Sequence, residues 1–104
     1  MSDPRQGDVW WAEAEDKRRP VLVVTRNEAI PVLHRLLVAP VTRTVRGIPT
    51  EVALGAGEGL PVECAASFDN LQPINRRLLT EQIGALHASR RHELCDALDA
   101  LADC

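Results

Sequence analysis

Residues 7–25 read GDVWWAEAEDKRRPVLVVT, and this stretch predicts two β-strands. Residues 7–13 combine valine with two tryptophans, and residues 20–25 form an apolar, β-branched run that begins with proline. Aromatic and β-branched side chains favour strands, and proline is tolerated at the first residue of a strand. Trp10 and Trp11 would face opposite sides of such a strand, so one belongs in the core and the other lies nearer the surface.

The residues that follow continue the strand pattern and then change to a helical one. After about residue 88, apolar side chains recur at three- and four-residue spacing at Leu94, Leu98 and Leu101, which predicts one amphipathic helix. Many short strands followed by one helix indicate a mostly β member of the α+β class, with a small, strongly bent sheet or barrel of about six strands. The four further strands are expected at residues 34–41, 50–54, 62–68 and 70–74.

Length and composition favour one small domain spanning residues 1–104. The chain is 45% hydrophobic, and its apolar runs are much shorter than the roughly 20 residues that cross a bilayer. The N-terminal sequence shows no secretory signal, so we expect a cytoplasmic protein. Cys64, Cys95 and Cys104 are odd in number and irregularly spaced, as is typical of reduced thiols.

The charge distribution is uneven. The net charge of −3 by itself argues against a nucleic-acid partner. The first fifty residues, however, carry eight Lys or Arg against six acids. Pairs and triplets of bases occur at expected loops, notably at residues 17–19 and at Arg43 with Arg46. These clusters indicate local positive potential, or else ordinary solvated turn charges.

Familiar catalytic motifs are absent from the sequence. It contains no GxSxG, P-loop, GxGxxG or HExxH pattern, and His34, His87 and His92 are scattered. His92 and Cys95 share a helical spacing, but a zinc site needs three or four ligands. We therefore expect no metal and no cofactor.

Arginine and hydroxyl side chains instead gather at expected strand ends. Arg19 directly precedes Pro20, and Thr42 and Thr44 end the strand that contains Pro40. A guanidinium binds phosphate through a charge-assisted fork, and a hydroxyl adds a neutral donor. This arrangement predicts a phosphate-binding site.

Five stretches follow one another over nearly the whole chain: GDVWWAE, KRRPVLVVT, LLVAPVTRTVRGIPTEV, CAASFDNLQPI and RRLLTEQIGAL. In this order they resemble the MazF/PemK family of toxin endoribonucleases. The resemblance implies an SH3-like barrel that forms a homodimer and cuts single-stranded RNA without a metal. It also implies a cognate MazE-like antitoxin whose disordered tail covers the RNA groove.

The resemblance also implies residue roles. Arg19 matches the catalytic arginine of the family and Thr42 its catalytic threonine, in a reaction in which the 2′-hydroxyl of the RNA attacks the adjacent phosphorus. Arg18 is one position away from Arg19, which is preferred because it directly precedes Pro20, and Thr44 is the alternative hydroxyl. The loop over residues 12–18 is shorter than the glycine-containing loop of many relatives. The expected RNA contacts are Arg18, Arg43, Thr44, Arg46, Phe68, Asp69 and Asn70.

Two other classes of function stay open. A toxin of the same barrel, like CcdB, can act by poisoning gyrase, and its relatives share the architecture rather than the Arg-Pro and Thr pair. An SH3-like module without activity would use the same aromatic and arginine surface to dock a peptide.

Overall fold

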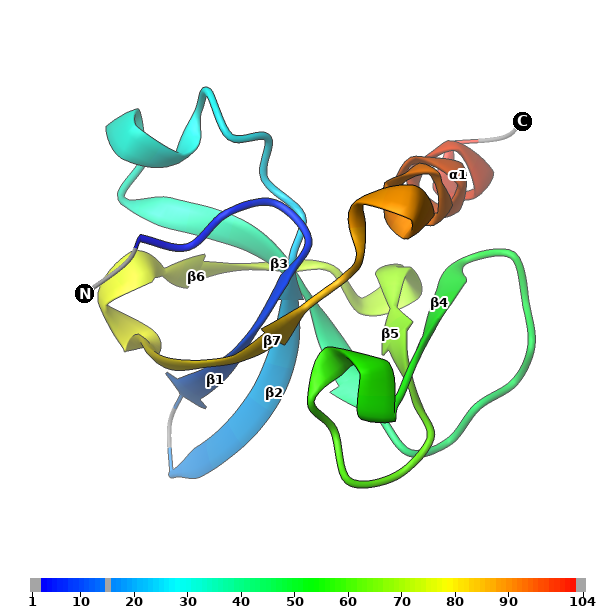
Figure 1. Ribbon diagram of the computed structural model, residues 1–104. Helices are drawn as coiled ribbons and strands as arrows, with labels where there is room; N and C mark the ends of the chain where they lie inside the picture. The colour runs from blue at the N-terminus through cyan, green and yellow to red at the C-terminus, as the bar shows by residue number, and fades with distance from the viewer. Residues whose placement is uncertain (1–2, 15, 103–104) are drawn as a thin grey trace.

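The computed structural model describes residues 3–14 and 16–102. In this part of the chain, seven strands form one strongly curved antiparallel sheet that is followed by a helix (Figure 1). The strands are β1 (Asp8–Ala14), β2 (Lys17–Val23), β3 (Arg35–Thr42), β4 (Glu51–Leu54), β5 (Cys64–Ser67), β6 (Gln72–Asn75) and β7 (Leu79–Ala85). The helix is α1 (Arg91–Leu101), and the single-turn 3₁₀ helices are η1 (Ile30–Val32), η2 (Ala56–Glu58), η3 (Phe68–Asn70), η4 (Arg76–Leu78) and η5 (Ala88–Arg90).

Strand β3 joins the two halves of the sheet. The strand order is β4-β5-β3-β2-β1-β7, and β6 also pairs with β3. The pairing of β2 with β3 ends at Pro40, a residue that has no N–H to donate. Beyond it, Val41 and Thr42 pair with β5, which lies on the other edge of β3. The end of β3 therefore pairs with β5 but no longer with β2.

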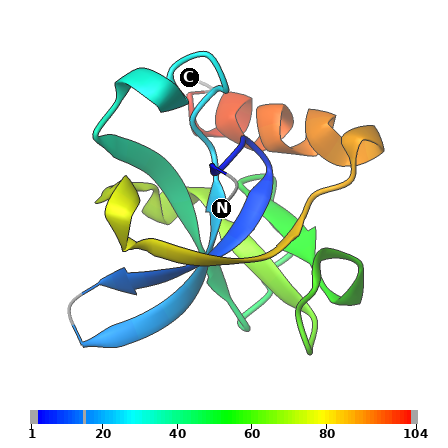
Figure 2. The same cartoon turned by 60° about the vertical axis from the view of Figure 1, so that its left-hand side comes forward.

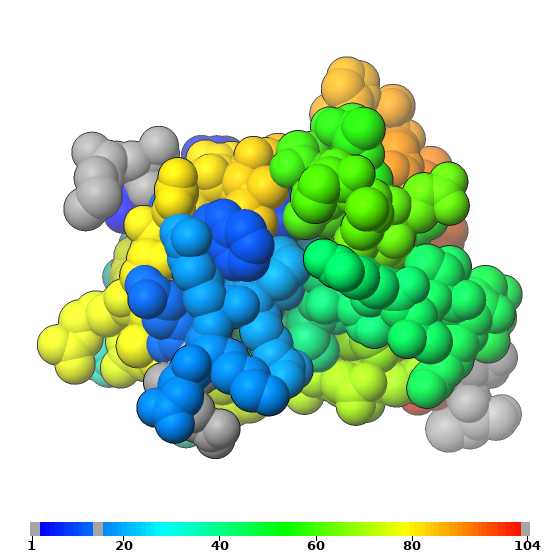
Figure 3. Space-filling model, turned by 90° about the horizontal axis from the view of Figure 1, so that it is seen from below, coloured from blue at the N-terminus to red at the C-terminus, as the bar shows by residue number. Residues whose placement is uncertain are grey.

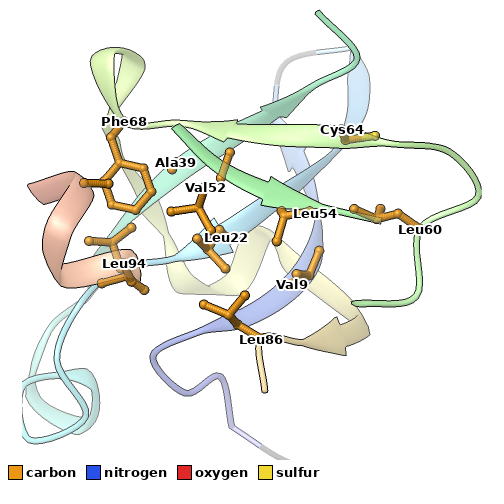
Figure 4. Close-up of a cluster of buried hydrophobic side chains, with 13 residues drawn as sticks. Val9, Leu22, Ala39, Val52, Leu54, Leu60, Cys64, Phe68, Leu86 and Leu94 are labelled. Atoms are coloured by element: carbon orange, nitrogen blue, oxygen red, sulfur yellow. The ribbon is translucent and has the colours of Figure 1, made fainter. Parts of the chain in front are cut away.

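Strand alternation builds two hydrophobic clusters on opposite faces of β1 and β2. Val9 and Leu22 belong to one cluster, which η3 and α1 cover with Phe68 and Leu94 (Figure 4). The next residues along the two strands point to the second cluster. Both faces of the central strands are thus buried. The second cluster consists of Trp10, Ala12, Val21, Val23, Ile30, Leu36, Val38, Ile74 and Leu79.

Helix α1 lies at one end of the molecule, and the β1–β2 hairpin extends from the other (Figure 2). Arg90, the residue before the helix, fixes this position. Its guanidinium bonds to the carboxylates of Glu58 (3.1 Å) and Glu93 (2.8 Å) and to the carbonyl oxygen of Ala53 (2.7 Å). The C-terminal helix is therefore connected to β4 and to the end of η2.

The expected class is confirmed, with two differences in detail. All six expected strands overlap observed ones, but β7 is a seventh strand that the sequence did not predict. Its residues LTEQIGA include Glu, Gln and Gly, which have low strand propensity, and it is a strand because it pairs with β1. The helix begins at Arg91 rather than near residue 88, because η5 occupies the preceding turn.

The cysteines that the structure describes are not paired in a disulfide. Cys64 is buried and Cys95 is exposed, and both are free thiols; Cys104 lies outside the described residues. Within residues 3–14 and 16–102, the structure contains no helix with the length and apolar content needed to span a membrane.

Candidate functional site

A hollow of about 870 Å³ opens beside the C-terminal end of β3, beyond the last pair of the β2–β3 ladder. The N-terminal part of β2 forms one side of the hollow. The loop between β3 and β4 forms a second side, and the segment from η3 to β6 forms a third. In Figure 3 the β1–β2 hairpin lies beside this β3–β4 loop. The lining residues are Arg19, Pro40, Val41, Thr42, Arg43, Thr44, Arg46, Glu51, Ser67, Asp69, Asn70, Leu71 and Gln72.

The strand register brings Arg19 and Thr42 to this hollow from opposite strands. Val21 pairs with Pro40 in the antiparallel ladder, Arg19 lies two residues before Val21, and Thr42 lies two residues after Pro40. Side chains two residues apart in a strand share a face. Arg19 and Thr42 therefore lie next to each other beyond the Val21–Pro40 pair, on the same face of the sheet as that pair. The guanidinium of Arg19 makes no hydrogen bond or ion pair with any described residue and is available to a ligand.

The hydroxyl of Thr42 is held by the backbone. The N–H of Thr44 donates to Oγ1 of Thr42 over 3.1 Å. Because this bond uses a lone pair of the oxygen, the hydroxyl proton remains available to donate. Thr44 lines the same hollow two residues further along. Thr42 can therefore supply a donor to a bound phosphoryl oxygen.

The β3–β4 loop, residues 43–50, carries two more arginines along the hollow. Glu51 Oε1 accepts from the N–H groups of Arg46 and Gly47, each over 3.0 Å. Gly47 has φ +67°, a conformation that side chains rarely adopt. The side chains of Arg43 and Arg46 have no partner among the described residues. Glu51 thus fixes the loop backbone and leaves both guanidinium groups free.

The third side of the hollow is polar and internally bonded. Thr50 Oγ1 donates to Oδ2 of Asp69 over 2.6 Å, and Nδ2 of Asn70 donates to Oγ of Ser67 over 2.9 Å. The hollow therefore combines two carboxylates that already accept hydrogen bonds with three unpaired arginines. A net positive charge gathers there although the whole chain carries −3.

Two of the expected RNA contacts do not reach the hollow. Arg18 lies on the other face of β2, because successive strand residues alternate. Its guanidinium stacks 4.6 Å from the ring centre of Trp11 and bonds to Glu81 over 2.8 Å. Phe68 is 1% exposed and packs in the core, so it offers no surface for stacking. Neither residue lines this hollow.

The other expected site residues line it together: Arg19, Thr42, Arg43, Thr44, Arg46, Asp69 and Asn70. Sequence reasoning missed Glu51, Ser67 and Gln72. Glu51 was assigned only to an alternating strand, and no local motif links it to the arginines that precede it. Gln72 lies in the expected strand after Asn70, where alternation alone does not reveal which face borders a hollow.

The tryptophans divide as the strand alternation predicts. Trp10 is buried and donates from Nε1 to Oδ2 of Asp8 over 3.2 Å, whereas Trp11 is half-buried beneath Arg18. Neither lines the hollow. The lining is therefore suited to hydrogen bonding and charge neutralisation more than to aromatic stacking. Within the described residues, no three His, Cys, Asp or Glu side chains gather as metal ligands.

The chain is similar to known proteins over most of its length. The profile of the PemK-like, MazF-like toxins of type II toxin-antitoxin systems matches residues 5–102. The chain is 42% identical over 103 residues to the probable endoribonuclease MazF5 of Mycobacterium tuberculosis, covering 97% of this chain and 94% of that protein. It is 46% identical over 83 residues to endoribonuclease MazF3 of the same organism, covering 80% and 81%.

Solved structures show the same likeness. Mycobacterium tuberculosis toxin MazF-mt6 aligns with a TM-score of 0.85 and 42% identity, covering 92% of this chain and 96% of that one. A MazE-MazF crystal structure from Deinococcus radiodurans aligns at 0.80 and 26% identity, covering 99% and 98%. The chain therefore belongs to the PemK-like, MazF-like family of type II toxins.

Proposed function

We propose that this protein is an endoribonuclease toxin that cuts single-stranded RNA at short sequences. One observation carries the proposal: the guanidinium of Arg19 and the hydroxyl of Thr42 line one hollow with Arg43 and Arg46, and all three arginines are unpaired among the described residues. Relatives at 42% and 46% identity are named probable endoribonuclease and endoribonuclease. Cutting of transcripts would stop translation and growth.

The proposed reaction uses a nucleophile that RNA already contains. The 2′-oxygen forms a bond to the adjacent phosphorus and the bond from phosphorus to the 5′-oxygen breaks. The products are a 2′,3′-cyclic phosphate and a 5′-hydroxyl. The proton of the 2′-hydroxyl leaves and the departing 5′-oxygen gains one, so the step is balanced. Because nucleophile and target are held next to each other in the substrate, the reaction needs no metal.

Arg19 and Thr42 act on the charge that develops on the phosphoryl oxygens. Preorganised donors stabilise that charge most strongly where they point at the transition state. A guanidinium is a poor proton acceptor, so we assign Arg19 electrostatic stabilisation rather than proton abstraction. Thr42 donates its hydroxyl proton as a hydrogen bond while its oxygen accepts from Thr44. Arg43, Arg46 and the polar groups of Asp69 and Asn70 hold the flanking nucleotides.

The proposed partners follow from the same family. We expect a homodimer that works in the cytoplasm and a cognate MazE-like antitoxin whose segment covers the hollow. A MazE-MazF structure with 26% identity over 99% of this chain supports an antitoxin partner. A segment lying over Arg19 and Thr42 would exclude RNA by occupying the same donors.

Incubating the purified protein with single-stranded RNA and an excess of chelator tests the proposal. We expect cleavage that leaves cyclic phosphate and 5′-hydroxyl ends. Thr42→Val should lower the cleavage rate by roughly 10²-fold, while Thr42→Ser, which keeps the hydroxyl, should retain much more of it. Inhibition of gyrase supercoiling without RNA cleavage would contradict the proposal and favour a CcdB-like action.

A further inference from the structure

A second, smaller recess borders the main hollow on the far side of Arg19. Its volume is about 190 Å³, below the roughly 300–1,000 Å³ of pockets that take drug-sized ligands. It shares Arg19, Pro40 and Gln72 with the main hollow. A phosphodiester bound by Arg19 would therefore lie beside this recess. The lining is Ala12, Lys17, Arg19, Val21, Pro40, Gln72 and Ile74.

The recess has an apolar floor. Ala12, Val21 and Ile74 are 3%, 2% and 6% exposed and belong to the second core cluster. Ala12 pairs with Arg19 across β1 and β2, so the small side chain lies at the base of the arginine. The half-buried ring of Pro40 adds another apolar wall. This apolar floor suits the flat face of a ring.

The rim of the recess is formed by polar side chains that are available to bind a ligand. Lys17 and Gln72 are exposed, and within residues 3–14 and 16–102 neither side chain has a hydrogen bond or ion pair. The amide of Gln72 presents a donor and an acceptor side by side, and such an amide pairs with adjacent groups on a base edge. The ammonium group of Lys17 adds a donor toward base acceptors.

We propose that this recess takes one nucleobase of the RNA, next to the bond that is cut. Gln72 is the residue that reads its edge. The inference rests on the proposed endoribonuclease function and deepens it by locating one position of sequence preference. The base lies against Ala12, Val21, Ile74 and Pro40, and Gln72 selects it through the amide. Arg19 separates the recognised base from the phosphate that reacts.

Mapping the cut sites of the wild-type protein and of Gln72 variants in a pool of randomised single-stranded RNA tests the subsite. Gln72→Ala should weaken the preference at one position adjacent to the cut by roughly 5- to 100-fold, the discrimination of a bidentate contact, and leave the other positions unchanged. Gln72→Glu removes the donor and should shift that position toward bases that present an amino group. Gln82→Ala is the matched control, because this exposed glutamine lies on β7 and borders neither hollow.

Ala12→Val provides a second test that leaves the polar rim intact. The larger side chain fills part of the recess from its floor. We therefore expect a lower cleavage rate at the preferred sequences, and a weaker base preference at the same position that the Gln72 variants affect. Melting temperatures show whether Ala12→Val folds. If it does not fold, the cut patterns of the Gln72 variants alone test whether the recess binds a base. An unchanged cut pattern in Gln72→Ala would overturn the subsite while leaving the proposed function standing. If the wild-type protein cuts no RNA, the proposed function fails and the subsite with it.

Discussion

At the scale of single residues, two adjacent arginines have different surroundings. Arg18 is stacked on Trp11 and paired with Glu81, whereas Arg19 lines the hollow without a partner among the described residues. The exposed ion pair of Arg18 contributes little stability. The difference arises only because neighbouring strand residues point to opposite faces. These two positions therefore allow a direct test of which arginine acts on RNA.

We expect Arg19→Ala to lower the rate of RNA cleavage by roughly 10²- to 10³-fold, because it removes a preorganised donor to the developing charge. Single-turnover cleavage of a short RNA measures this loss. Arg18→Ala is the matched control and should cut at a rate close to that of the wild-type protein. The assignment of the catalytic arginine would be wrong if the Arg18 variant lost activity and the Arg19 variant kept it.

At the scale of elements, the β3–β4 loop depends on one carboxylate. Glu51, the first residue of β4, accepts from two loop N–H groups and so holds Arg43 and Arg46 along the hollow. Glu51 is a positioning residue in this account, since it acts through the loop rather than on the reacting atoms. Its effect should therefore appear in RNA binding.

Glu51→Ala should raise the KM for RNA by roughly tenfold with little change in kcat, because the loop arginines lose their fixed placement. Glu51→Gln keeps an acceptor oxygen at the same place and should restore KM to near the wild-type value. Steady-state cleavage kinetics separate the two constants. A Gln variant as impaired as the Ala variant would show that the charge of Glu51, not its hydrogen bonds, matters.

At the scale of the whole molecule, Arg90 connects α1 to the β4 and η2 region. Glu58, which is buried, also accepts from the N–H of Gly55 over 2.6 Å and so depends on Arg90 to balance its charge. The backbone of Glu58 approaches β7 closely, since a Cβ added at Gly84 would collide with the carbonyl oxygen of Glu58. The helix, the η2 turn and β7 therefore meet around one pair of opposite charges.

Arg90→Ala should lower the free energy of unfolding by about 3 kcal/mol, because it leaves the buried carboxylate of Glu58 unpaired. The melting temperature should fall by roughly 10 °C or more. Arg91→Ala, an exposed neighbour on α1, is the control and should change stability by less than about 0.5 kcal/mol. Equal effects of the two variants would show that the connection adds no stability.

The contacts of Arg90 also predict that the stability of the protein depends on pH. The hydrogen bond from Arg90 lowers the pKa of Glu93 below its ordinary value, so the ionised carboxylate is favoured in the folded state. This contribution is complete above the ordinary carboxyl pKa and is lost as the pH falls through the lowered pKa. The stability difference between the wild-type protein and Arg90→Ala should hold steady from about pH 6 upward and narrow below about pH 4. Thermal unfolding across this range measures it, and a difference that widens in acid would contradict the assignment.

The amino-acid sequence by itself determined the elements and the types of residue that make the site. Local propensity and alternation predicted six strands and the C-terminal helix, because those preferences are properties of a residue and its near neighbours. They did not predict β7, whose Glu, Gln and Gly residues form a strand through pairing with β1. The resemblance already preferred Arg19 to Arg18, but it also led us to expect an RNA contact from Phe68, which is buried.

Only the tertiary structure decided which side chains meet. Arg19, Thr42, Glu51 and Gln72 come from four different strands, and they line one pair of hollows because β2, β5 and β6 all pair with β3 and β4 pairs with β5. Phe68 is buried because η3 turns it toward α1, and Arg18 is excluded by the face on which it lies. The physical reason is that register and strand pairing act over long sequence separations, where a shift of one residue moves a side chain to the other face of the sheet.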